Sequence, residues 1–339
     1  MRLTTVFCTA AVTLGVAVVF AAPANPDRDM KKVLKELEAK GGKPIESLSA
    51  AEARTQPTPA DAVKSLMKNE NISAGPKQVD VKDIQVQGAV GMIAARTYTP
   101  AGKKPLPIVV YYHGGGFVIA TNDVYDATPR ALSEQTGAIF VSVEYRKGPE
   151  SKFPAAHDDA FTAYKWILEN AASLGGDPKH VAVAGESAGG NLALNVAIRA
   201  RDEKVQLPSH ELLIYPVAST DMNSESYKKN ADAKPLNKPM MAWFMKNYTS
   251  SEAEAKDPRL NLVAADLKGV SPATIITAEI DPLRSEGKLL AERLQAAGVK
   301  VDYKDYTGVT HEFFGMAAVV NDAKAAQKFA SKQLKDSLH

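Results

Sequence analysis

The sequence predicts an α/β fold in which a mostly parallel sheet of eight strands is covered by helices on both faces. Two observations support this prediction. From about residue 79 to residue 334, short apolar runs alternate with longer amphipathic segments, which is typical of parallel sheets built from strand–helix units. The chain also has 339 residues, which is enough for one large α/β domain with insertions.

Each expected element follows from its local pattern. Apolar runs predict eight strands, and the first two are expected to be neighbours. The predicted strands are Val79–Gln87, Val90–Tyr98, Leu106–Tyr112, Ala138–Glu144, Val181–Ala184, Leu212–Tyr215, Thr274–Ala278 and Val301–Tyr306. Amphipathic spacing predicts helices over Met30–Lys40, Pro59–Asn69, Ala127–Gln135, Ala156–Asn170, Ala188–Arg201, Arg284–Ala297 and Ala317–Leu334.

The first 24 residues have the character of a signal peptide. A short positive start precedes an almost wholly apolar stretch over residues 6–20, and small residues follow it. We expect cleavage after Ala21 or Ala24, because Pro23 disfavours a cut after Ala22. An uncleaved membrane anchor is the alternative, but the apolar run is short for a span. The protein is therefore expected to be exported, either to the periplasm or out of the cell.

Charge and cysteine content exclude several classes of function. The formal net charge of +2 gives no strong attraction to nucleic acid or to a membrane surface. The single cysteine, Cys8, lies within the signal peptide. The mature chain would then form no disulfide and could not use a thiol nucleophile.

Two segments lie outside the strand–helix alternation of the domain expected over residues 77–339. Residues 25–76 are polar and helix-forming, and their apolar spacing suggests helices that pack on something. Residues 217–258 are far longer than a typical connection. They contain the segment Pro239–Met245, rich in methionine and aromatic side chains. This segment reads either as a core helix or as a lid over an apolar pocket.

Ser187 is the expected nucleophile of a serine hydrolase. It lies in the sequence Gly185-Glu186-Ser187-Ala188-Gly189, with a strand-like run before it and a helical run after it. This is the pattern of a nucleophile elbow, in which the two glycines make room for a sharp turn. The turn would hold the serine hydroxyl group out at the carboxyl edge of the sheet.

A second motif, His113-Gly114-Gly115-Gly116, follows an apolar strand and predicts an oxyanion hole. We assign its donors to the N–H groups of Gly115, Gly116 and Ala188. A phosphate-binding loop is disfavoured, because no Lys-Ser/Thr pair follows the glycines. His113 is expected to hold this loop in place rather than to take part in catalysis.

His311 and Asp281 are the expected base and acid. His311 follows the last predicted strand across the short loop 307–310, which places it at the same edge as Ser187. Asp281 follows the preceding strand, and Glu279 and Glu286 are its rivals. The other five histidines are less well placed for this role, and they are His113, His157, His180, His210 and His339.

These motifs resemble the hormone-sensitive-lipase-like family of bacterial esterases, within the α/β-hydrolase superfamily. The resemblance runs from about residue 108 to residue 316, and further matches are Tyr215-Pro216, Asp257-Pro258-Arg259, Asp281-Pro282-Leu283-Arg284 and His311-Glu312-Phe313-Phe314. It implies an α/β-hydrolase fold and a carboxylesterase with the triad Ser187, Asp281 and His311. It also implies no cofactor, no metal, and a helical cap built from the N-terminal segment and an insertion.

The chain departs from the family pattern at two positions. The family often has Asp at the position of Glu186 and Gly at the position of Glu312. Glu186 keeps the negative charge of Asp on a longer side chain. If Glu312 reaches the imidazole group of His311, it should raise the pKa of that group, so that the base stays protonated to a higher pH.

The expected reaction is hydrolysis of a small-molecule ester of short to medium acyl chain length through an acyl-serine intermediate. A serine amidase or peptidase and a non-catalytic small-ligand receptor on the same fold remain alternatives. We expect no nucleic-acid partner and no membrane span after signal cleavage. A homodimer is compatible with the sequence, which does not settle the oligomeric state.

Overall fold

The computed structural model describes residues 25–73 and 79–338. One eight-stranded sheet runs through the molecule in the order β1-β2-β4-β3-β5-β6-β7-β8. Its strands are β1 (Val79–Gly88), β2 (Gly91–Pro100), β3 (Leu106–Tyr112), β4 (Ile139–Val143), β5 (Gly176–Glu186), β6 (Glu211–Ile214), β7 (Ala273–Ile280) and β8 (Val301–Thr310). The pairings β1–β2 and β2–β4 are antiparallel, and all others are parallel. The predicted fold class is confirmed.

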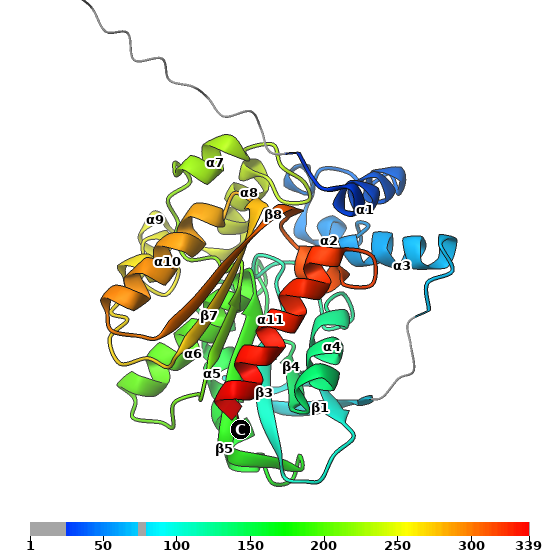
Figure 1. The fold of residues 1–339 in the computed structure, drawn as a ribbon. Coiled ribbons are helices and arrows are strands. Elements are labelled where there is room, and N and C mark those ends of the chain that lie inside the picture. The colour runs from blue at the N-terminus through cyan, green and yellow to red at the C-terminus, as the bar shows by residue number, and fades with distance from the viewer. Residues whose placement is uncertain (1–24, 74–78, 339) are drawn as a thin grey trace, which may run out of the picture.

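Helices cover both faces of this sheet (Figure 1). They are α1 (Arg28–Ala39), α2 (Ala50–Ala53), α3 (Pro59–Asn69), α4 (Ala127–Thr136), α5 (Ala155–Asn170), α6 (Ala188–Asp202), α7 (Glu225–Lys229), α8 (Lys238–Tyr248), α9 (Glu252–Ala255), α10 (Arg284–Ala296) and α11 (Asn321–Leu338). Short 3₁₀ turns lie at η1 (Ile45–Ser47), η2 (Leu262–Ala264) and η3 (Phe313–Met316).

The central strand β3 shows why both faces must be covered. Its residues alternate between two hydrophobic clusters, with Val110 in one and Val109 in the other. Helices α5, α6 and α10 contribute to the first cluster, and α4 and α11 contribute to the second. A strand buried on both sides is apolar throughout, which is the pattern that the sequence showed.

Three elements differ from the expected bounds by four residues or more. Strand β5 begins at Gly176, so His180 lies within the strand and not before it. Strand β8 runs to Thr310, so the expected loop at 307–310 is strand, with an irregular register opposite Ala278–Ile280. Helix α11 begins at Asn321 rather than at Ala317, because η3 takes up the chain after His311.

The two segments outside the alternation lie at the same end of the molecule (Figure 1). The indole N–H of Trp243 in α8 donates a hydrogen bond to the carbonyl oxygen of Leu48, at 2.9 Å. The amide group of Asn237 donates another to Glu46, at 3.2 Å. The N-terminal helices and the insertion are thus linked directly, although their role as one cap stays a prediction.

None of the helices in the described part of the chain combines the length and the apolar character that a membrane crossing requires. The predicted signal peptide lies outside the described residues.

Candidate active site

Ser187 lies between β5 and α6 in a strained backbone conformation. Its φ angle is +55° and its ψ angle is −116°, which a residue with a side chain rarely adopts. A Cβ atom on Gly185 would come within 2.1 Å of the Gly189 carbonyl oxygen, and one on Gly189 within 1.9 Å of the Tyr112 carbonyl oxygen. Only glycine fits at either place, so the turn keeps the shape that the elbow motif predicted.

The structure brings the three predicted residues together. The Nε2 atom of His311 lies 3.0 Å from the Ser187 Oγ atom, and the Nδ1 atom lies 2.6 Å from Asp281 Oδ2. The other Asp281 oxygen accepts the Leu283 N–H at 2.8 Å. All three side chains are buried. A hydroxyl, an imidazole and a carboxylate in this order can pass a proton away from the serine oxygen.

The two alternative acids, Glu279 and Glu286, make hydrogen bonds to groups other than His311. Glu279 accepts a hydrogen bond from the Gly308 N–H, and Glu286 accepts bonds from the N–H groups of Ala218 and Ser219. His311 makes its carboxylate hydrogen bond to Asp281. The geometry therefore favours Asp281 over both glutamates.

The remaining described histidines lie in other networks. His157 contacts Tyr248 and Asn191, and burial lowers its pKa to about 4. His210 contacts Thr274, and burial likewise lowers its pKa to about 4. His180 pairs with Asp177 near the surface. His339 lies outside the described residues.

The electrostatics of the site raise the pKa of the His311 imidazole group. Burial alone would lower this pKa. The Asp281 carboxylate, together with smaller contributions from Glu312 and Glu186, outweighs that effect and raises the pKa above its usual value. The direction agrees with the expectation for Glu312, although Asp281 is the larger cause.

The glycine loop lies beside the nucleophile. Gly115 and Gly116 line the same cavity as Ser187 and His311, with φ angles of +97° and +58°. Their N–H groups donate no hydrogen bond to another of the described residues. Ala188 is the first residue of α6, and an N–H group at that position has no acceptor within the helix. These are the donors that an oxyanion would need.

The imidazole of His113 supports this loop, as expected. Its Nδ1 atom lies 2.7 Å from the Gly114 carbonyl oxygen, and its ring stacks on Tyr145 at 4.5 Å between ring centres. The Tyr145 hydroxyl group donates to the carbonyl oxygen of His113, at 2.8 Å. His113 is fully buried and does not line the cavity.

The cavity above Ser187 is small, with a volume of about 80 Å³. Its apolar wall includes Pro59 from α3, and Met240 and Phe244 from α8. Met241 and Trp243 of the same helix are buried in the core. Helix α8 therefore packs in the core and also borders the cavity, while its role as a lid stays a prediction.

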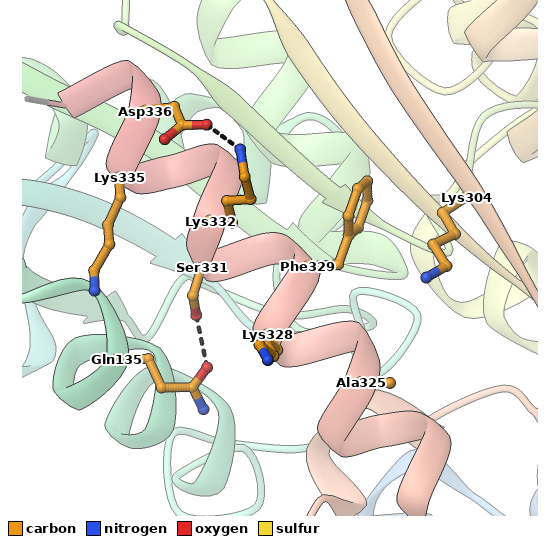
Figure 2. Close-up of a pocket in the computed structure, with 9 residues that line it drawn as sticks. All are labelled: Gln135, Lys304, Ala325, Lys328, Phe329, Ser331, Lys332, Lys335 and Asp336. Carbon is orange, nitrogen blue, oxygen red and sulfur yellow. Dashed lines mark hydrogen bonds and ion pairs between the residues drawn. The ribbon is translucent and has the colours of Figure 1, made fainter.

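A larger hollow of about 650 Å³ lies elsewhere, between α4, α11 and β8. Figure 2 shows that lysine side chains border it, among them Lys304, Lys328 and Lys335, and that Lys332 pairs with Asp336. Neither Ser187 nor His311 lines it. The smaller cavity is the one that holds the candidate chemistry.

Glu186 is fully buried beside the nucleophile. It accepts hydrogen bonds from the hydroxyl groups of Tyr111 and Tyr215. Burial, and after it the charge of Glu312, raise the pKa of Glu186 to about 7. Its contacts show how a side chain longer than aspartate is accommodated at this position.

Glu312 faces the cavity, where Tyr125 donates a hydrogen bond to its Oε1 atom. That atom is 4.0 Å from the Nε2 atom of His311. Burial raises the pKa of Glu312, against the opposing effects of His311 and Tyr125. Sequence reasoning assigned no role to the tyrosines around the two glutamates. The available signals were Tyr111, in the strand before the glycine loop, and Tyr215, in the Tyr215-Pro216 match to the family.

Comparisons with known proteins agree on one family. A family model described as "alpha/beta hydrolase fold" matches residues 109–315. Carboxylesterase NlhH of Mycobacterium tuberculosis is 41% identical over 252 residues, which cover 73% of this chain and 79% of that protein. Ethyl acetate hydrolase of Pseudomonas putida is 31% identical over 306 residues, which cover 88% and 94%.

Solved structures show the same likeness. A thermostable esterase from Pseudomonas putida superposes with a TM-score of 0.84 at 33% identity, covering 94% of this chain and 99% of that one. An esterase from Pyrobaculum calidifontis superposes with a TM-score of 0.80 at 36% identity, covering 89% and 96%.

Proposed function

This chain belongs to the α/β-hydrolase fold family and is a serine ester hydrolase, and we propose that Ser187, His311 and Asp281 carry out the hydrolysis. One observation carries the proposal. The His311 imidazole lies between the serine hydroxyl and the buried aspartate, at 3.0 and 2.6 Å, beside a cavity that also borders the glycine loop.

The reaction follows from these positions. His311 takes the hydroxyl proton as the Ser187 Oγ atom attacks the ester carbonyl carbon. The N–H groups of Gly115, Gly116 and Ala188 stabilise the oxyanion, and Asp281 stabilises the imidazolium ion. His311 then protonates the leaving alcohol, and an acyl-serine remains. Water activated by His311 releases the acid.

The substrates that we propose are small esters with short to medium acyl chains. The cavity volume of about 80 Å³ is far below the roughly 300–1,000 Å³ that is usual for ligand sites. Its apolar wall suits a hydrocarbon chain, but Phe244 and Met240 leave little length for one. We also propose export, on the signal peptide that the sequence predicts at residues 1–24.

The test is hydrolysis of p-nitrophenyl esters from acetate to palmitate by the mature protein and by Ser187→Ala. We expect activity that is highest for the shorter chains and falls to background in the variant. Activity retained in Ser187→Ala would contradict the assignment of the nucleophile. Rates for palmitate that match those for acetate would contradict the assignment of chain length.

A further inference from the structure

Glu312 occupies a backbone conformation that is unfavourable for a residue with a side chain. Its φ angle of +70° and ψ angle of 0° lie in the left-handed region. A residue with a side chain pays about 1–2 kcal/mol there, and glycine avoids that cost. Backbone strain of this kind often marks functional sites, and Glu312 directly follows the candidate catalytic base.

The carboxyl group is held close to the atom that moves the proton. Oε1 lies 4.0 Å from His311 Nε2, and Tyr125 donates a hydrogen bond to the same oxygen. The Tyr125 hydroxyl group lies close against Gly114, where a Cβ atom would come within 2.2 Å of it. Glu312 is thus anchored between the glycine loop and the imidazole group.

The carboxyl group keeps capacity for another hydrogen bond. About 22% of the Glu312 side chain stays accessible, and the residue lines the cavity above Ser187. Its Oε2 atom accepts no hydrogen bond from another of the described residues. A carboxyl oxygen accepts more than one hydrogen bond, so Oε1 also has a free lone pair.

Hydrolysis of the acyl-serine, the second step of the proposed reaction, needs such a hydrogen-bond acceptor. The attacking water must donate one proton to Nε2, and its second proton needs a partner inside a small apolar cavity. A water molecule that donates to two acceptors with bonds of about 2.8 Å needs those acceptors about 4.4 Å apart. The 4.0 Å between Nε2 and Oε1 is close to that separation.

We propose that Glu312 accepts a hydrogen bond from the water molecule that hydrolyses the acyl-serine, and so positions that water for attack. The inference rests on the proposed esterase function and deepens it. The water oxygen bonds to the acyl carbon while one of its protons passes to Nε2. The bond from that carbon to Ser187 Oγ then breaks, and Nε2 returns its proton to Oγ. The second proton stays on the product acid, so Glu312 directs the water without consuming a proton.

Methanol provides a direct test, because it can also attack the acyl-serine but carries only one hydroxyl proton. That proton goes to Nε2, and none is left for Glu312. Removing the carboxyl group should therefore slow hydrolysis more than methanolysis. The ratio of methyl ester to free acid, formed from p-nitrophenyl acetate in a fixed concentration of methanol, measures this difference.

The variant for this test is Glu312→Gly, because glycine accepts the left-handed backbone. We expect its ratio of methyl ester to acid to rise about 10-fold when each variant is measured on the alkaline plateau of its own pH–rate profile. Glu312→Gln, whose amide oxygen still accepts a hydrogen bond, should return the ratio to within about 3-fold of the wild type. An unchanged ratio in Glu312→Gly would overturn the proposal, and so would a Glu312→Gln ratio as high as that of Glu312→Gly.

Glu186→Gln is the matched control, since it also neutralises a buried carboxyl group near the triad but does not border the cavity. Its ratio should equal that of the wild type, and a rise as large as in Glu312→Gly would assign the effect to charge and overturn the proposal. Release of p-nitrophenol by the wild type that is lost in Ser187→Ala tests the esterase function separately. Equal release by both proteins would remove the proposed function, whereas release that is lost in Ser187→Ala together with an unchanged ratio in Glu312→Gly would remove only the role of Glu312.

Discussion

The Asp281 carboxyl group makes two buried hydrogen bonds at once, to the His311 ring and to the Leu283 N–H. It therefore fixes both the tautomer and the direction of the imidazole group. Asp281→Asn should lower kcat about 10³- to 10⁴-fold, as loss of the orienting acid does in other serine hydrolases. Steady-state kinetics on p-nitrophenyl butyrate would measure the loss.

Glu279→Gln serves as the control, because Glu279 follows the same strand but contacts Gly308 rather than His311. Its kcat should stay within about 5-fold of the wild type. A larger loss in Glu279→Gln than in Asp281→Asn would contradict the assignment of the acid.

The raised pKa of His311 has a consequence for the dependence of rate on pH. Only the neutral imidazole accepts the serine proton, so the rate should fall as the pH drops through a value above the usual 6.5. Asp281 is the larger cause of the shift, and Glu312 adds to it. Glu312→Gln should therefore move the acidic limb of the kcat/KM profile to lower pH. An unmoved limb, or a limb moved to higher pH, would contradict this account.

Most single residues of the site could be predicted from the sequence, because each directly follows a strand or sits in a short motif. Ser187 and the glycine loop carry such motifs, and Asp281 and His311 follow neighbouring strands that end at one edge. The hydroxyl groups of Tyr125 and Tyr215 could not be predicted. They reach the glutamates only through contacts between segments that are distant in the chain, 187 residues apart for Tyr125 and Glu312.

At the scale of elements, the proposed preference for short acyl chains rests on the residues of α8 that border the cavity. Both Phe244 and Met241 are buried in the core, but only Phe244 also lines the cavity. Phe244→Ala should lengthen the cavity. The ratio of kcat/KM for p-nitrophenyl octanoate to kcat/KM for p-nitrophenyl acetate should then rise about 10-fold, since each methylene group newly accommodated contributes about 0.8 kcal/mol.

Met241→Ala is the control within the same helix. It should lower the free energy of unfolding by about 2–5 kcal/mol, as core truncations do, and leave the ratio of the two substrates unchanged. Equal ratios in Phe244→Ala and the wild type would show that α8 does not limit acyl length.

The turn between β5 and α6 depends on the absence of a side chain at Gly189. A Cβ atom there would meet the backbone of Tyr112, which cannot move without shifting β3. Gly189→Ala should lower the melting temperature by at least about 5 °C, because a backbone clash costs more than about 1–3 kcal/mol. Gly298→Ala is a useful comparison, since a Cβ atom there meets nothing within 4 Å, although its φ of +84° leaves some strain. A smaller loss in Gly189→Ala than in Gly298→Ala would contradict this reading of the turn.

Elements with uniform burial or with a clear cap were predicted closely, as β3 and α3 show. Strand β3 is apolar throughout and was predicted with its observed bounds. The end of β8 was not, because Thr307 and Gly308 carry turn-like sequence while Thr310 still pairs with Ile280 across an irregular register. The short turn η3 was missed for a similar reason, since its aromatic residues are buried by tertiary packing rather than by helical spacing.

At the scale of the whole molecule, the chemistry depends on convergence at one edge of the sheet. Strands β5, β7 and β8 are parallel neighbours or near neighbours, so the residues that follow them meet at the same edge. The N-terminal segment also reaches this edge, where Thr58 and Pro59 line the cavity. The convergence of the strands at one edge could be predicted from the order of strands and helices along the chain. The sequence could not show the contact of α8 with Leu48, because no local pattern encodes it.

The central claim is that Ser187 is the nucleophile, and covalent trapping tests it most directly. The protein would be treated with an organophosphate that releases p-nitrophenol, and its intact mass and its peptides would then be measured. The account predicts one phosphoryl adduct per chain, located on Ser187, and none in Ser187→Ala. An adduct on another residue, or one formed equally fast in Ser187→Ala, would contradict it.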